Sequence, residues 1–311
     1  MIIIYFFSYF SFLVFIILII NKIRQYSGTP LHLRWDLYPI AHERERNKYG
    51  GSYYEEPDWW NKRNKKSRLS ELLEVLEEIF FLKGVYHHNK KLWYYTFPFH
   101  LGLYLITGSI FLIISSIILD ISSSADIFWQ NNTAEYILFY LINTAGYTGM
   151  VLTFSGCLGL ILERLTEKKY RFYNAPMDFI NLFFILGILI TGMFTIEPSN
   201  SSFILYKIYL RNLFTFNFTV IAKPVFLVHI SLVSAFLLYF PVTRMRHLFA
   251  KYFTYHRVRW EDNPNLKGGK LDSKIRESLN FRVSWSAPHI NAGNNWAETS
   301  AKLPPEVKNV E

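Results

Sequence analysis

Cysteine is almost absent from this chain of 311 residues, which contains one, Cys157. A single thiol cannot form a disulfide within the chain. It also cannot hold an iron–sulfur cluster, which needs several thiolates, and the chain has no C-x-x-C-H motif for a c-type haem. Any iron–sulfur chemistry must therefore come from a partner protein.

Charged residues make up only 18% of the sequence, which is 51% hydrophobic and 18% aromatic. Five apolar segments are each long enough to cross a bilayer as a helix. They cover about 2–20, 93–118, 134–162, 178–196 and 221–242. The first lacks both the basic start and the small-residue cleavage site of a signal peptide, so we expect it to be retained. The fold predicted is an all-α membrane protein built on a bundle of five transmembrane helices.

Lysine and arginine are scarce in two of the connections between these segments. Connection 119–133 has none and 197–220 has two, whereas 21–92 has fourteen, 163–177 has four and 243–311 has twelve. The positive-inside rule then predicts the N-terminus outside, with the loop 21–92 and the C-terminal tail in the cytoplasm. The net charge of +9 is explained by topology, which argues against a nucleic-acid partner.

The pattern divides the chain into four regions. We expect a first transmembrane helix at 1–20, a cytoplasmic loop at 21–92, a four-helix membrane core at 93–247 and a cytoplasmic tail at 248–311. Within the loop, apolar residues recur at helical spacing between Ser67 and Leu82, opposite four glutamates, which predicts an amphipathic helix. An acidic polar face suits anionic lipid poorly, so a protein partner is the preferred contact. Part of the polar tail is expected to order on a partner.

Three histidines lie in or beside the apolar segments. His229 and His247 are eighteen residues apart, five turns of a helix, which places both rings on one face about 27 Å apart if the helix is continuous. His100 lies in another segment, twenty residues from Asp120. Helical rise puts both His100 and His247 near the inner face. Histidines on facing helices can hold haem iron from both sides, so His100 and His247 are candidate ligands of one haem.

A purely structural role, without a cofactor, also fits each of these residues. A membrane histidine can simply bond a hydroxyl or a carbonyl, and His229 has no visible partner histidine. Arg244, one turn from His247, could pair with a haem propionate or act only as a positive-inside anchor. The glycines of the membrane helices serve either helix packing or space for a macrocycle. Six histidines outside the spans are predicted to be surface residues: His32, His42, His87, His88, His256 and His289.

At these histidines the sequence resembles a known family. His229, followed by Phe240-Pro241-Val242-Thr243-Arg244 and His247, is similar to the last helix of the respiratory nitrate reductase gamma subunit family. Phe99-His100-Leu101-Gly102 is similar to its first haem-binding site. The resemblance implies a membrane cytochrome b with haem held by His100, His247 and His229, with these histidines as the iron ligands. The family's further histidine, ten residues after the first, is replaced here by Ile110. The resemblance therefore supports the inner haem and leaves the outer haem without its second histidine, for which Met193 is one alternative ligand.

Other motifs resemble gamma-subunit relatives in redox complexes of sulfate-reducing bacteria. They are Arg34–Pro39, Tyr49–Glu56, Asp58-Trp59-Trp60 and Trp285–His289. These relatives include membrane subunits of Tmc-type and heterodisulfide-reductase-like complexes. The resemblance implies the bacterial cytoplasmic membrane, menaquinone as exchangeable substrate, and a cytoplasmic iron–sulfur partner resembling the iron–sulfur subunit of heterodisulfide reductase. A periplasmic cytochrome c is a further potential partner.

Three classes of function fit the pattern. The leading hypothesis is an electron-transfer subunit that exchanges electrons between menaquinone and the iron–sulfur partner. The alternative is a non-redox anchor for a soluble enzyme. A transporter is disfavoured, because its helices would break around a polar midplane site, whereas Pro98, Pro224 and Pro241 all lie near predicted segment ends.

Overall fold

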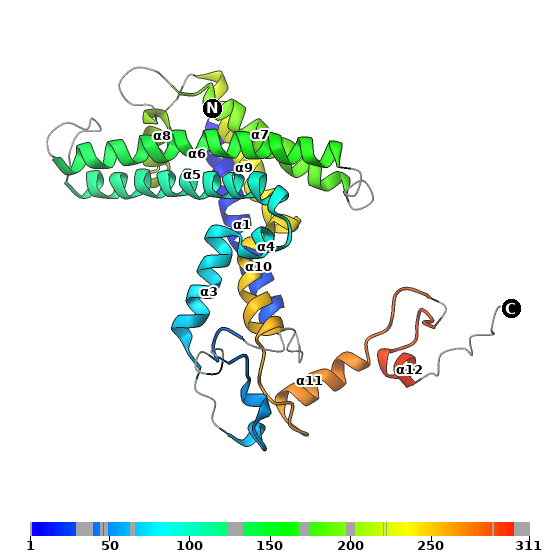
Figure 1. The fold of residues 1–311 in the computed structure, drawn as a ribbon. Coiled ribbons are helices and arrows are strands. Elements are labelled where there is room, and N and C mark those ends of the chain that lie inside the picture. The colour runs from blue at the N-terminus through cyan, green and yellow to red at the C-terminus, as the bar shows by residue number, and fades with distance from the viewer. Residues whose placement is uncertain are drawn as a thin grey trace. The chain divides into compact units, whose positions relative to one another are not determined.

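The computed structural model describes residues 2–28, 40–43, 46, 49–62, 66–123, 133–167, 174–196, 203–219, 221, 223–287 and 289–301. They form two compact units. The first contains Met1–Ile20 and Glu74–Arg246, and the second contains Asn21–Leu73 and His247–Glu311. The described residues are mainly helical (Figure 1), with two isolated β-bridges near the C-terminus. The motif 34–39 lies outside the described residues.

All five predicted membrane segments form helices long and apolar enough to cross a bilayer. They are α1 (Ile2–Gly28), α5 (Lys90–Ser123), α6 (Thr133–Thr166), α7 (Pro176–Met193) and α9 (Pro224–Tyr239). Pro98 lies inside α5, in its third turn, and not near a helix end as expected. The orientation of the helices across the membrane stays a prediction.

Shorter helices occupy the connections and the tail. The predicted amphipathic helix is confirmed as α3 (Arg68–Phe81). The others are η1 (Tyr53–Glu55), η2 (Trp59–Asn61), α4 (Lys83–His88), α8 (Ile204–Phe214), α10 (His247–Phe253), the π-helix η6 (Thr254–Arg259), α11 (Lys270–Leu279) and α12 (Trp296–Ala301). The sequence pattern did not predict α8, because charged residues interrupt its apolar positions.

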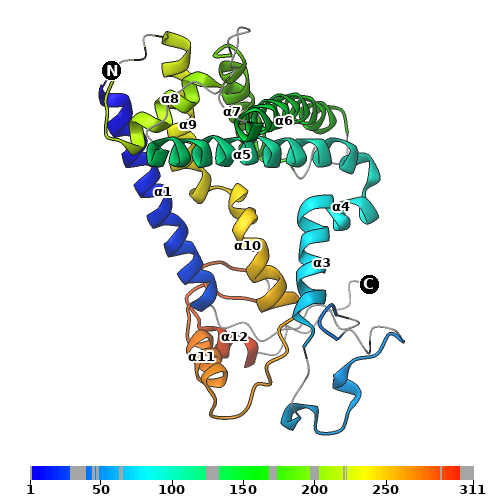
Figure 2. The ribbon, with the colours of Figure 1, turned by 90° about the vertical axis from the view of Figure 1, so that its left-hand side faces the viewer.

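Helices α5 and α6 pack against each other, side by side in Figure 1 and overlapping in the view of Figure 2. Glycines allow this contact: a Cβ on Gly102 would lie 2.6 Å from the carbonyl oxygen of Gly149, and one on Gly156 would lie 2.6 Å from the backbone nitrogen of Phe99. Both distances are too short for a real side chain. These glycines therefore serve helix packing, as small residues commonly do in membranes.

Helix α9 ends earlier than the spacing of the two histidines implied. It stops at Tyr239 and is followed by 3₁₀ turns at η4 (Phe240–Val242) and η5 (Arg244–Arg246). Pro241 has no backbone N–H for a helical hydrogen bond, and Thr243 between the turns is extended, with ψ of 177°. The prediction that one continuous helix carries His229 and His247 on a single face is therefore wrong, and the depth estimate for His247 from helical rise no longer holds.

The second unit is organised around a buried histidine that we predicted to be at the surface. His42 is 1% exposed. Its Nδ1 lies 2.8 Å from Glu71 and its Nε2 lies 3.0 Å from Asp262. The hydroxyl of Tyr53 donates to the backbone carbonyl of Asp262 at 3.2 Å. The prediction failed because the carboxylates that compensate for burial come from distant parts of the sequence.

Asp262 has a lowered pKa in this cluster. Burial raises its pKa, but the hydrogen bonds from His42 and Lys66 outweigh burial and lower the pKa to about 2. The side chain is 4% exposed and stays ionised at neutral pH. The ionised carboxylate therefore stabilises the junction between the loop and the tail.

Candidate haem site

His100 lies on α5, two residues after Pro98. Its Nδ1 is 2.8 Å from the carbonyl oxygen of Thr96, one turn earlier. A carbonyl oxygen only accepts, so this contact places the ring proton on Nδ1. Metal-bound histidines are commonly oriented in this way through the nitrogen that does not bind the metal. His100 is therefore set up to offer Nε2 as an iron ligand.

His229 lies on α9 and is oriented by the neighbouring helix α7. Its Nδ1 is 3.1 Å from the carbonyl oxygen of Ile188 and 3.1 Å from the hydroxyl of Thr191. The ring also lies 5.5 Å from the ring of Tyr206, nearly edge to face. A Cβ on Gly192 would come within 3.1 Å of this imidazole. His229 is 6% exposed and, like His100, directs Nε2 away from its orienting carbonyl.

His247 is the first residue of α10 and belongs to the second unit. Its pairing with His100, which lies in the first unit, therefore stays a prediction. Arg244 lies in η5, and its side chain is 71% exposed. Its guanidinium is 3.7 Å from Asp178, whose carboxylate is also 3.5 Å from Arg164. Arg244 thus has an acidic partner that lies sixty-six residues earlier in the chain.

The residues of the first unit fit a flat macrocycle in two respects. His100 and His229 each have Nδ1 held at a carbonyl oxygen, so each imidazole leaves Nε2 available as an iron ligand. Two glycines have open space beside them: a Cβ on Gly108 or Gly187 would meet nothing within 4 Å. Gly187 lies one turn before Thr191, which contacts His229. Among the described residues no group of three or more metal-ligating side chains is present, and two axial imidazoles do not require one.

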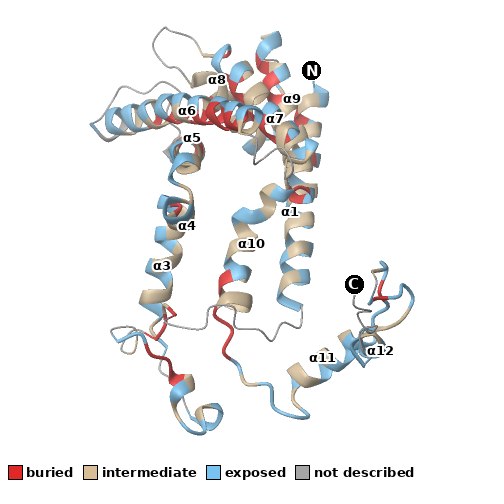
Figure 3. Cartoon of the chain, turned by 45° about the vertical axis from the view of Figure 1, so that its right-hand side comes forward, coloured by how far each residue is buried: buried red, intermediate tan, exposed pale blue. Residues whose placement is uncertain are grey.

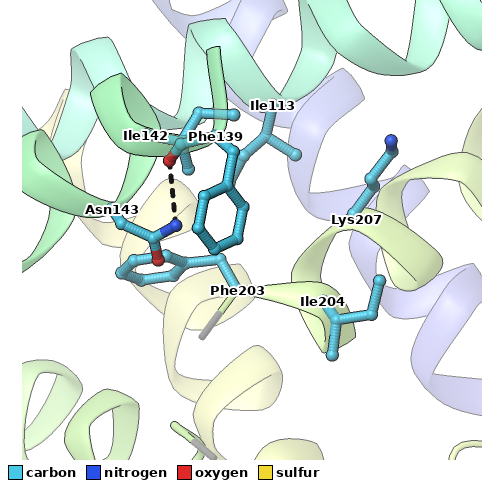
Figure 4. A pocket seen from close by; sticks show the side chains of 7 residues that line it. All are labelled: Ile113, Phe139, Ile142, Asn143, Phe203, Ile204 and Lys207. Carbon is cyan, nitrogen blue, oxygen red and sulfur yellow. Dashed lines mark hydrogen bonds between the residues drawn. The ribbon is translucent and has the colours of Figure 1, made fainter. Parts of the chain in front are cut away.

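A pocket lies between α5, α6 and α8 (Figure 4). Its walls are mainly apolar, and its lining residues are Ile113, Phe139, Ile142, Asn143, Phe203, Ile204 and Lys207. Asn143 donates to the carbonyl of Phe139 at 2.8 Å. Its Oδ1 is buried without a hydrogen-bond partner. An unpaired buried amide oxygen is costly, so the Oδ1 of Asn143 is an available hydrogen-bond acceptor in the pocket wall.

Tyr206 connects this pocket to the histidine on α9. Its ring lies 5.9 Å from that of Phe203 in the pocket wall and 5.5 Å from that of His229. Its hydroxyl is 2.7 Å from that of Thr195. Burial raises the pKa of Tyr206 to about 12, so the phenol remains neutral. One aromatic side chain therefore separates the pocket from His229.

Comparison with known proteins decides the family. The model of the nitrate reductase gamma subunit family matches residues 84–261, more than half of the chain. The chain belongs to this family. With its five apolar helices, it is a multi-pass membrane protein of an electron-transport family. No curated protein and no solved structure matches the chain.

The sequence predicts the orienting contact of His100 but not that of His229. Thr96 is four residues before His100, and that spacing alone brings a helical carbonyl within reach of the ring. Thr191 and Ile188 are about forty residues from His229, and only the packing of α7 on α9 brings them together. The sequence holds no signal for that second contact.

Proposed function

We propose that this member of the nitrate reductase gamma subunit family is a membrane cytochrome b. In this proposal it exchanges electrons between menaquinone and a cytoplasmic iron–sulfur protein. The observation that carries the proposal is the orientation of His100 and His229 through Nδ1 in a chain of this family. A haem b, when bound, supplies one-electron redox chemistry. The protein supplies the imidazole ligands, their tautomers and an apolar surrounding.

The firmly held haem is assigned to His100 and His247. Support comes from the resemblance of both motifs to the family and from the open space beside Gly108. Arg244 would hold a haem propionate and give up its contact with Asp178, which is 3.7 Å long. The Arg244 side chain is largely exposed in that contact. An exposed ion pair contributes little to stability, so such an exchange costs little free energy.

The outer end of the core is proposed to hold the quinone. Ile110 replaces the histidine that would complete a second haem, so His229 is assigned to a quinone oxygen. A neutral imidazole with its proton on Nδ1 accepts at Nε2 from a quinol hydroxyl. The neighbouring pocket adds Asn143, whose unpaired Oδ1 accepts a second donor. Quinol oxidation releases two electrons and two protons, and His229 and Asn143 are the proposed proton acceptors, with the side chain of Tyr206 between the pocket and His229.

The proposed partner resembles the iron–sulfur subunit of heterodisulfide reductase, as in Tmc-type and heterodisulfide-reductase-like complexes. Support comes from the single buried cysteine, which leaves the chain without an iron–sulfur centre of its own. We place the basic loop and tail, and hence this partner, on the cytoplasmic side of the bacterial membrane. A periplasmic cytochrome c is a second acceptor consistent with this arrangement.

A quinol-driven reduction assay tests the proposal. Purified chain in lipid vesicles should show reduction of its haem on addition of a soluble menaquinol analogue, followed in the visible spectrum. The His289→Ala variant is a suitable control, because His289 is an exposed residue of the tail. A chain that binds haem but is not reduced would reject the quinone assignment. A chain without haem would favour the alternative, a non-redox anchor.

A further inference from the structure

Helix α3 exposes its apolar face, although its polar face is engaged by the chain itself. None of its residues is buried (Figure 3). Five large apolar side chains are between 36% and 58% exposed: Leu69, Leu72, Leu73, Leu76 and Phe80. They lie on one side of the helix, at spacings of three, four and seven residues. A soluble helix would bury this face, so the exposed row requires an apolar environment.

Each glutamate of the opposite face has a partner within the chain. The Glu71 carboxylate contacts His42 at 2.8 Å. Glu74 and Glu77 both contact Lys83 at 2.9 Å. Glu78 accepts from the backbone nitrogen of Gly84 at 2.7 Å. The four carboxylates are therefore held by the chain itself, and Lys83 offsets part of their negative charge. Contact with lipid would then involve the apolar row and not the acidic face.

The C-terminal end of α3 is fastened to a membrane-spanning helix. The hydroxyl of Tyr104 donates to the carbonyl oxygen of Ile79 at 3.0 Å, and Nε1 of Trp93 donates to that of Phe81 at 2.8 Å. The rings of Phe80 and Tyr104 lie 5.7 Å apart. Trp93 and Tyr104 both belong to the candidate span Lys90–Leu119. The C-terminal end of α3 therefore lies against α5 through Ile79, Phe80 and Phe81.

We propose that α3 lies in the membrane–water interface, with Leu69, Leu72, Leu73, Leu76 and Phe80 inserted among the lipids at the Lys90 end of α5. Interfacial helices of this kind bury the apolar face at the boundary between headgroups and acyl chains. Exposed aromatic residues at the end of the helix and after it, Phe81, Tyr86 and Tyr94, suit the same depth. Helix α3 precedes the segment that matches the family, residues 84–261. It is a surface that the family match does not account for.

Depth-dependent quenching on the full chain tests this inference. In a Cys157→Ser background, Leu72→Cys and Ser70→Cys carry one fluorescent probe each. The two positions are two residues apart, about 200° around the helix, and so lie on opposite faces. The protein is reconstituted in phosphatidylethanolamine and phosphatidylglycerol vesicles. One quencher is a lipid with a nitroxide near its headgroup, and the other is aqueous iodide.

The probe at Leu72 should lose most of its fluorescence to the nitroxide lipid and little to iodide, and the probe at Ser70 should show the reverse. Equal quenching of both probes by iodide would overturn the proposal. A probe at Leu72 that is shielded from iodide only in a complex isolated from native membranes, and not in pure lipid, would also overturn the proposal. That result would assign the exposed apolar side chains of α3 to a protein partner. Leu76→Cys repeats the test if the Leu72 variant fails to fold.

Discussion

Nδ1 of His229 lies 3.1 Å from the carbonyl oxygen of Ile188 on the neighbouring helix. The carbonyl can only accept, so the imidazole proton is on Nδ1 and Nε2 is an acceptor while the ring is neutral. The hydroxyl of Thr191, at 3.1 Å from the same nitrogen, narrows the orientation of the ring further. The packing of α7 on α9 thus defines the chemistry available at His229.

His229→Ala should slow menaquinol oxidation and leave the haem spectrum unchanged, because Ile110 offers no second ligand for a haem at this depth. Thr191→Val should have a smaller effect of up to about tenfold, since one hydrogen bond contributes about 1 kcal/mol. Stopped-flow reduction kinetics measure both. Thr107→Val is the matched control, because the Thr107 hydroxyl bonds only within its own helix, to Leu103, and is exposed. Loss of haem from His229→Ala would instead identify this residue as a ligand.

Asn143→Leu should weaken quinol binding at the pocket between α5, α6 and α8. The substitution removes the buried Oδ1 that has no partner, and with it a hydrogen bond worth roughly 1 kcal/mol. We expect a higher KM for the menaquinol analogue and equal or greater stability of the protein without quinol. An unchanged KM would show that the quinone binds elsewhere.

Gly156→Leu should destabilise the membrane core. A Cβ there meets the backbone of Phe99 at 2.6 to 2.8 Å, and overpacking costs about 1–3 kcal/mol or more. Gly28→Leu is the control, because a Cβ at Gly28 meets nothing within 4 Å. Thermal unfolding in detergent compares the two variants, with the fraction of protein that stays monodisperse measured as the temperature rises. Equal melting temperatures would contradict the packing role of Gly156.

Asp262→Asn should loosen the loop and tail of the second unit at neutral pH. The pKa of Asp262 is lowered to about 2 from 3.8. The carboxylate therefore contributes roughly 2 kcal/mol above about pH 4, and this contribution is lost as the pH falls through 2. Hydrogen exchange of peptides covering Tyr53 and Trp260 measures the change in the full chain. The difference from the native chain should be complete at pH 7 and shrink below pH 4. A difference that grows on acidification would contradict this sign.

The five membrane helices and α3 could be predicted from the sequence, because apolar residues at helical spacing over such lengths allow few other structures. The position of His42 could not, since its burial depends on carboxylates at Glu71 and Asp262 that only folding brings near. The end of α9 at Tyr239 was also missed. Pro241 was visible in the sequence, but the extended backbone of Thr243 that follows it was not.

The sequence predicts those contacts of the candidate site that lie within one helix. The spacing from Thr96 to His100 is that of one helical turn. The contacts of His229 come from α7, and the partner of Arg244 is Asp178, sixty-six residues earlier in the chain. Interhelical contacts of this kind depend on packing that no short motif encodes.

The haem content of the purified chain tests the central claim most directly. A pyridine haemochrome assay with the reduced visible spectrum should give a b-type α band and one firmly held haem per chain. His100→Ala and His247→Ala should each lose it, because one axial imidazole holds the iron weakly, and His289→Ala should keep it. Absence of any b-type band in the native chain, or full haem content in both ligand variants, would contradict the account.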